Sequence, residues 1–138
     1  MHNEGHQIGN HSFSHSNFFG FFSSKNIEKE LRQTASAIQS ITGEDSRIFR
    51  PPFGITNPEI KKALHILGYT LIGWRVRTYD GTIKSEKLIL RNATQHLKSG
   101  DIVLFHDNYP QIPNVLEQFL IHLADRGFQS VRIDQIHI

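Results

Sequence analysis

The sequence predicts an α/β fold with parallel strands, arranged either as a sheet or as a barrel. Segments with helical periodicity alternate with short apolar segments from residue 26 to residue 133. Glycine and proline stand at many of the boundaries between them, where they end helices and form turns. Apolar strands separated by helices of this length are typical of parallel sheets, which are buried on both faces. The 138 residues fit a single domain, residues 1–138.

Each predicted helix has a polar or proline-containing start or a glycine at its end. The helices are expected from Asn26 to Gly43, from Asn57 to Gly68, from Ser85 to near Gly100, and over Ile112–Arg126 before Gly127. In the first helix, one face is apolar and carries Ile27, Leu31, Ala35, Ile38 and Ile41. The strands are expected at Arg47–Phe49, Tyr69–Val76, Asp101–His106 and Phe128–Ile133, with the middle two buried, and residues 1–22 are expected to be irregular.

Composition limits the classes of protein that the chain can represent. Hydrophobic residues make up 38% and charged residues 20%, which indicates a globular rather than a disordered chain. The formal net charge is only +2 and no dense basic run exists, so the sequence gives no support for a nucleic-acid partner. The apolar stretches are too short for a membrane span. Cysteine is absent, which excludes disulfides and thiolate metal ligands.

Three polar segments follow the predicted strands directly. They are Arg50–Gly54, Arg77–Gly81 and His106-Asp107. In parallel α/β folds the functional residues gather at the carboxyl ends of the strands. The positions of these segments therefore predict a functional site at that end of the sheet or barrel.

Two of the nine histidines stand at a spacing that suits a metal ion. His11 and His15 lie at i and i+4, which on a helical turn places both imidazoles on one face. The alternative is a pair of solvated histidines in a polar loop, because two ligands do not complete a site. Six of the other seven have no partner at ligand spacing and are expected to be surface or packing residues: His2, His6, His65, His96, His122 and His137.

The segments after the first and third predicted strands could each carry chemistry. Arg50 precedes a stiff Pro-Pro-Phe-Gly turn and could hold a carboxylate in a fixed geometry, although the segment taken alone fits a surface arginine beside an ordinary turn better. His106 ends an apolar strand, where it could act as a general acid or simply bond to a backbone carbonyl. Trp74 and Asp80, taken alone, fit a core tryptophan and a turn aspartate.

In their order along the chain, these segments resemble the polysaccharide deacetylase family. Residues 5–15, GHQIGNHSFSH, are similar to its second motif, a His-Ser/Thr-x-x-His metal loop. Residues 50–54, RPPFG, are similar to the third motif, and residues 102–107, IVLFHD, to the fifth. The segment from Trp74 to Asp80 occupies the place of the fourth. The resemblance extends over nearly the whole chain and implies a (β/α) barrel.

The resemblance implies a hydrolase that removes acetyl groups from N-acetylated sugars of a polysaccharide or oligosaccharide. Members of the family hold one divalent metal ion, usually zinc, with two histidines and an aspartate, and His11 and His15 match the histidines. His106 matches the acid that protonates the leaving amine, and Asp80 the aspartate that tunes that histidine. Arg50 matches the residue that orients the catalytic base.

The resemblance also assigns the surroundings of the substrate. The backbone N–H of Phe53 matches the donor to the oxyanion, Leu104 matches the apolar wall around the acetyl methyl group, and Trp74 belongs with them as a substrate-binding residue. The fourth motif departs from the usual Asp-x-x-Asp-Trp, because Arg77 and Gly81 replace its first aspartate and its tryptophan. We therefore expect an altered groove near the acid.

The larger departure concerns the first motif of the family, an Asp-Asp pair that supplies the base and the third metal ligand. Ten residues precede His11 and none of them is aspartate. The resemblance thus implies a partial barrel that lacks its first strands, with the Asp-Asp pair expected in the reading frame upstream of Met1. Two alternatives stay open: a non-catalytic relative that binds glycan or metal, and, with less support, a small nucleic-acid-binding module.

Overall fold

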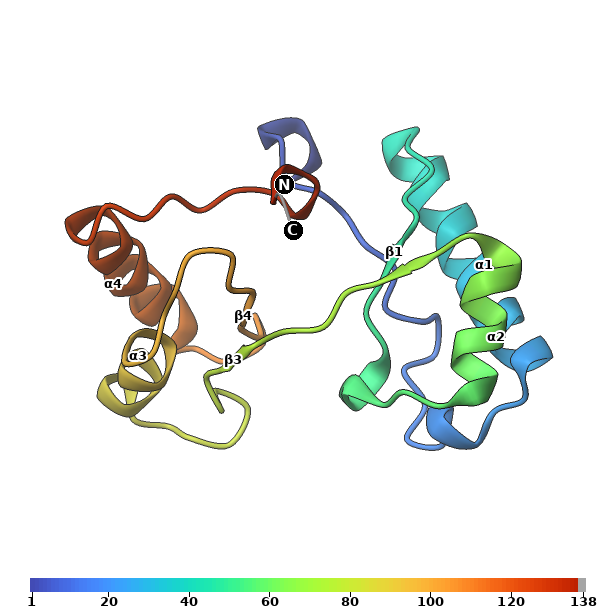
Figure 1. Ribbon diagram of the computed structural model, residues 1–138, viewed down its shortest axis with the longest axis horizontal. Helices are drawn as coiled ribbons and strands as arrows, with labels where there is room; N and C mark the ends of the chain where they lie inside the picture. The colour runs from blue at the N-terminus through green and yellow to red at the C-terminus, as the bar shows by residue number, and fades with distance from the viewer. Residues whose placement is uncertain (137–138) are drawn as a thin grey trace. The chain divides into compact units, whose positions relative to one another are not determined.

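The computed structural model of the chain describes residues 1–136 and divides into two compact units, Met1–Gly73 and Trp74–Ile138. Figure 1 shows the course of the chain. Each unit contains one pair of parallel strands and two α-helices. The prediction of helices alternating with parallel strands is therefore confirmed within each unit. No helix in residues 1–136 is both long enough and apolar enough to cross a membrane.

The first unit contains helices α1 (Ser24–Thr42) and α2 (Pro58–Leu67) and strands β1 (Ile48–Phe49) and β2 (Thr70–Leu71). The strands pair in parallel, with Phe49 opposite Leu71. Three short 3-10 helices complete the unit: η1 (His2–Glu4), η2 (Phe19–Phe21) and η3 (Pro52–Gly54). Residues 1–22 are otherwise irregular, as predicted.

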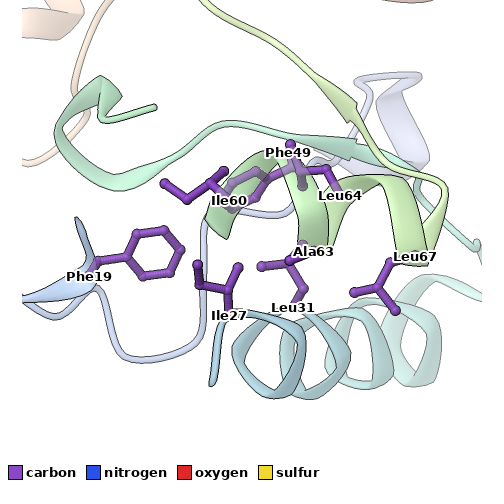
Figure 2. Close-up of a cluster of buried hydrophobic side chains, with 8 residues drawn as sticks. All are labelled: Phe19, Ile27, Leu31, Phe49, Ile60, Ala63, Leu64 and Leu67. Carbon is purple, nitrogen blue, oxygen red and sulfur yellow. The ribbon is translucent and has the colours of Figure 1, made fainter. Parts of the chain in front are cut away.

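The core of the first unit lies where α1 and α2 pack on β1 and η2. Figure 2 shows its buried side chains, which are Phe19, Ile27, Leu31, Phe49, Ile60, Ala63, Leu64 and Leu67. Burial of a large aliphatic or aromatic side chain contributes about 1.5–3 kcal/mol. This core fixes α1 and the carboxyl end of β1, from which the polar residues described below project.

The second unit contains β3 (Val76–Arg77), α3 (Glu86–Thr94), β4 (Val103–Leu104) and α4 (Ile112–Asp125), followed by η4 (Ile133–Gln135). Strands β3 and β4 pair in parallel, with Arg77 opposite Leu104. Two buried clusters hold α3 and α4 together: one of Ile89, Ile112 and Val115, the other of Ala93, Phe119 and Leu123.

Helix boundaries agree best with the prediction where capping chemistry is local. Helix α2 begins after Asn57, whose side chain accepts a hydrogen bond from the backbone N–H of Ile60, and ends at Gly68 in a left-handed conformation. Helix α1 ends at Gly43 as predicted, but its N-cap is Ser23 rather than Asn26, because the Ser23 hydroxyl accepts the bond from the Asn26 N–H. Ile41 is 83% exposed and does not belong to the buried face.

The predicted third helix is too long. Helix α3 ends at Thr94 rather than near Gly100. The Asp101 carboxylate accepts a hydrogen bond from the backbone N–H of Lys98, and the Asp101 N–H donates back to the Lys98 carbonyl. These bonds form a turn that replaces the last helical turn. Helix α4 ends at Asp125, one residue before the predicted end.

Three of the four strand predictions need correction, and one is confirmed. Strand β1 agrees with the prediction at Arg47–Phe49. The segment Tyr69–Val76 is not one buried strand, since β2 pairs with β1, β3 pairs with β4, and Leu71 is 38% exposed. The segment Asp101–His106 forms a ladder only at Val103 and Leu104, which are half-buried. No strand forms at Phe128–Ile133, because residues 128–132 have no ladder partner among the described residues and Ile133 begins η4.

Candidate functional site

In the first unit, a backbone bridge brings His11 to the carboxyl end of β1. Asn10 forms a parallel bridge with Phe49, so that His11 emerges beside Arg50. Nδ1 of His11 lies 2.6 Å from the carbonyl oxygen of Arg50. Because a carbonyl only accepts hydrogen bonds, Nδ1 carries the proton and Nε2 keeps its lone pair. This tautomer, fixed by a backbone carbonyl, is the usual one for a histidine that ligates a metal ion.

His15 faces His11, but not for the reason that the sequence suggested. The loop from 11 to 15 is not a helical turn, and Ser12 (φ 71°) and His15 (φ 47°) both adopt left-handed conformations. The two imidazole rings nevertheless approach to 5.0 Å between centroids, edge to face. The ring of Phe53 also contacts the His15 ring, with 5.0 Å between the centroids. The structure thus brings His11, His15 and Phe53 together.

Arg50 and Phe53 follow β1 in the turn that the prolines stiffen. The half-buried Arg50 guanidinium donates hydrogen bonds to the carbonyl oxygens of Ile72 and Gly73, each at 3.3 Å. Burial lowers the pKa of Arg50 from its usual high value. Phe53 has a left-handed backbone (φ 58°) inside η3, and its side chain is 54% exposed. Such a conformation is uncommon for a non-glycine residue and recurs at functional sites.

In the second unit, Asp80 and His106 meet at the carboxyl ends of β3 and β4. Asp80 is 2% exposed, and its carboxylate accepts a hydrogen bond from the backbone N–H of His106 at 2.6 Å. The second carboxylate oxygen lies 2.8 Å from Nδ1 of His106. The imidazole is 51% exposed, so the buried carboxylate fixes one ring nitrogen and Nε2 is the nitrogen that remains for a substrate.

Hydrogen bonds decide the ionisation of Asp80. Burial by itself raises the pKa of the carboxyl group, but the bonds from the backbone N–H and ring of His106 and from Thr78 together hold it below its ordinary value. Asp80 is therefore an anion at neutral pH. A buried anion beside a half-exposed imidazole orients that ring.

We expect Asp80→Asn to lower the free energy of unfolding by about 1.5–3 kcal/mol at pH 7, the typical contribution of hydrogen bonds to a charged group. Because the pKa is lowered in the folded state, this stabilisation is fully present above the ordinary carboxyl range and is lost as the pH falls through the folded value. The difference between wild type and variant should therefore shrink at acid pH, below the ordinary carboxyl range. Urea titrations followed by Trp74, the only tryptophan, measure it.

Asp125→Asn is the matched control, since Asp125 is exposed on α4 of the same unit. It should leave the free energy of unfolding nearly unchanged at both pH values. A difference between wild type and Asp80→Asn that is equally large at neutral and acid pH would contradict the role given to the ionised carboxylate.

The other residues expected near the substrate lie close to this pair in the chain. Leu104 is the β4 residue opposite Arg77, and its carbonyl accepts a hydrogen bond from the Thr78 hydroxyl at 2.8 Å. Trp74 is half-buried at the start of the second unit. The guanidinium of Arg77 lies 5.3 Å from the ring centroid of Tyr79, so a stacked cation occupies the place of the first aspartate in the usual fourth motif.

The remaining histidines that the structure describes do not gather into a site. His6, His65 and His96 are exposed, and His2 and His122 are half-buried, whereas His137 lies outside the described residues. His96 follows the end of α3 instead of lying within a helix. Within residues 1–136, no three His, Asp or Glu side chains are grouped so that they could hold a metal ion.

Three residues that support the site were not recognised from the sequence. Asn10, 1% exposed, donates to the Leu31 carbonyl and accepts from the Ser12 N–H. Buried Thr78 bonds to β4, and Glu30 bonds to the loop between the two histidines. The only sequence signal for any of them is the position of Asn10 directly before His11.

Comparison with known proteins identifies the family. The model of the polysaccharide deacetylase family matches residues 1–72. The peptidoglycan-N-acetylglucosamine deacetylase PgdA of Listeria monocytogenes is 28% identical over 134 residues, which are 97% of this chain and 28% of PgdA. The chain therefore spans little more than a quarter of the length of this curated relative.

Solved structures show the same likeness. The peptidoglycan deacetylase PdaC from Bacillus subtilis matches with a TM-score of 0.88 and 28% identity, over 97% of this chain and 64% of that chain. A CE4 family pseudoenzyme from Bacillus anthracis matches with a TM-score of 0.86 and 27% identity, over 94% of this chain and 46% of that chain. These matches confirm the predicted fold class, an α/β fold that forms part of a deacetylase-type barrel. The chain belongs to the polysaccharide deacetylase family.

Proposed function

We propose that the protein removes acetyl groups from N-acetylated sugars of a polysaccharide, with peptidoglycan as the substrate class that the names of PgdA and PdaC suggest. The observation that carries the proposal is the pair formed by buried Asp80 and half-exposed His106. In this proposal His106 is the general acid that gives its proton from Nε2 to the leaving amine. Asp80 holds the ring in the required tautomer and orientation.

His11 and His15 are the proposed ligands of one divalent metal ion, with zinc the expected metal. The donor set fits two positions of such a site, because the Arg50 carbonyl fixes the His11 tautomer and the second imidazole lies beside the first. When bound, the ion would polarise the acetamide carbonyl and a water molecule. A site with only two protein ligands is incomplete, since catalytic zinc usually has three.

The other proposed roles concern the substrate and the base. The backbone N–H of Phe53 is proposed to donate to the oxyanion, and its left-handed conformation sets the direction of that donor. Leu104 and Trp74 are proposed to contact the acetyl group and the sugar. Arg50, held by two backbone carbonyls, is proposed to orient the carboxylate that acts as base.

A second candidate function is glycan or metal binding without turnover. It is favoured by one observation, the absence in residues 1–136 of a third acidic or imidazole side chain near the histidine pair. The likeness to a CE4 family pseudoenzyme supports the same reading. On this candidate, the Asp80–His106 pair would stabilise the second unit and bind the sugar without transferring a proton.

Acetate release separates the two candidates. The longest open reading frame that contains these 138 residues, supplied with zinc, is expected to release acetate from N-acetylglucosamine oligomers or from peptidoglycan. The 138-residue chain alone is expected to release none, because none of the ten residues before His11 is an aspartate that could serve as base. Enzymatic assay of acetate measures both proteins on the same substrates.

Two outcomes would change the proposal. Binding of the glycan by the longer protein without release of acetate would support the non-catalytic candidate. Full activity of the 138 residues alone would show that a later aspartate serves as the base, and would contradict the expected need for additional acidic residues. A matched sample without zinc controls for hydrolysis that does not depend on metal.

A further inference from the structure

The Glu30 carboxylate lies beneath the loop that joins His11 and His15. One of its oxygens, Oε2, accepts three hydrogen bonds from this loop. The donors are the backbone N–H of Phe13 at 3.0 Å, the backbone N–H of Ser14 at 2.8 Å and the Ser14 hydroxyl at 2.9 Å. Glu30 itself is half-buried on α1, sixteen residues beyond Ser14 in the chain. These are charge-assisted hydrogen bonds, which are the stronger class.

The loop has a conformation that needs such support. Ser12 and His15 both have positive φ, a region that residues with a side chain rarely occupy. Two bonds within the loop help to define it: Ser12 N–H to the Asn10 side chain and His15 N–H to the Ser12 hydroxyl. Glu30 adds the connection between the middle of the loop and a rigid element.

Helix α1, which carries Glu30, is held in place by the core of the first unit. Ile27 and Leu31, on either side of Glu30 in the helix, are fully buried in the core of the first unit. The Asn10 side chain donates to the Leu31 carbonyl at 2.8 Å, so α1 also holds the residue that precedes His11. The two imidazoles are therefore placed relative to one helix through two independent sets of hydrogen bonds.

We propose that Glu30 is a positioning residue that fixes the loop in the conformation in which His11 and His15 face one another, and that it thereby sets the affinity of the pair for a divalent ion. The proposal rests on the proposed function, in which these histidines are the metal ligands. Oε2 of Glu30 is engaged by the loop, and among the described residues Glu30 does not group with His11 and His15 as a third ligand. Partners that orient ligands in this way typically contribute about 10- to 100-fold in metal affinity.

Glu30→Ala is expected to weaken zinc binding by about 10- to 100-fold in isothermal titration. It should also speed hydrogen exchange of the Phe13 and Ser14 amides in the metal-free protein, which a change in charge alone would not do. Glu30→Gln keeps an oxygen acceptor at the same place and should restore most of the affinity and of the amide protection. If the alanine variant fails to fold, the result expected for Glu30→Gln still tests the proposal.

Glu28→Ala is the matched control, because it removes the same charge from the same helix but breaks only a 3.9 Å ion pair with Arg32. It should change neither readout. Zinc affinity unchanged in Glu30→Ala, or lowered equally in Glu28→Ala, would overturn the positioning role while leaving the metal ligands in place. A wild-type protein that binds no zinc would instead refute the metal centre of the proposed function, and the positioning role with it.

Discussion

Replacing His106 with alanine is expected to lower kcat for acetate release by about 10²- to 10⁴-fold, the usual contribution of a general acid. KM should change little, because a proton given to the leaving amine stabilises the transition state and not the bound substrate. The expectation depends on the geometry of the second unit, where Asp80 engages Nδ1 of His106 and leaves Nε2 for the proposed proton transfer. The measurement is steady-state kinetics on an N-acetylglucosamine oligomer with the longest reading frame that contains this chain.

A substrate with a different leaving group separates acid catalysis from a structural role. Hydrolysis of an activated aryl acetate releases an aryloxide, a stable anion that needs no proton on leaving. His106→Ala should therefore slow this reaction much less than hydrolysis of the acetamide. His96→Ala, which changes an exposed histidine of the same unit, should leave both rates unchanged. Equal losses on the two substrates would remove His106 from the proton transfer, and an unchanged kcat on the acetamide would remove it from the mechanism altogether.

Local capping rules predicted the helices better than periodicity predicted the strands. Asn57 and Gly68 bound α2 residue for residue, because each cap depends on backbone groups within the same helix. A strand requires a partner elsewhere in the chain, and the sequence does not say which segments pair. The strand predicted at Phe128–Ile133 does not form, because the segment has no ladder partner among the described residues.

Some residues of the candidate site could likewise be predicted from the sequence, and others could not. The order of the motifs identified Asp80 and His106 together, and the structure places them in contact at adjacent strand ends. The spacing of His11 and His15 suggested a helical turn, whereas the rings meet through left-handed conformations at Ser12 and His15. Glu30 could not be found from the sequence, because its partners are two backbone N–H groups and the Ser14 hydroxyl, whose directions depend on the conformation of that loop.

The double variant His11→Ala/His15→Ala is expected to bind zinc with an affinity at least about 100-fold lower than the wild type. Loss of a residue that only supports a ligand lowers metal affinity by up to about 100-fold, so loss of both ligands should cost at least as much. Each histidine supplies one ligand, so either single variant should leave an isolated imidazole that binds only weakly. No acidic side chain in residues 1–136 joins the two histidines as a third ligand. The affinity of the wild-type 138-residue chain for zinc should therefore itself be modest, with water in the open coordination positions. Isothermal titration with zinc measures all four proteins.

The same titration tests where the remaining ligand comes from. The longest reading frame that contains this chain should bind zinc more tightly than the 138 residues if it supplies the aspartate that the family uses, and the difference should disappear in the double variant. His65→Ala/His96→Ala removes two exposed histidines that lie outside the pair and is the matched control. If His11→Ala/His15→Ala binds zinc as well as the wild type, or if the control loses as much affinity, the two histidines are not the metal ligands, and the Arg50 carbonyl orients His11 for another purpose.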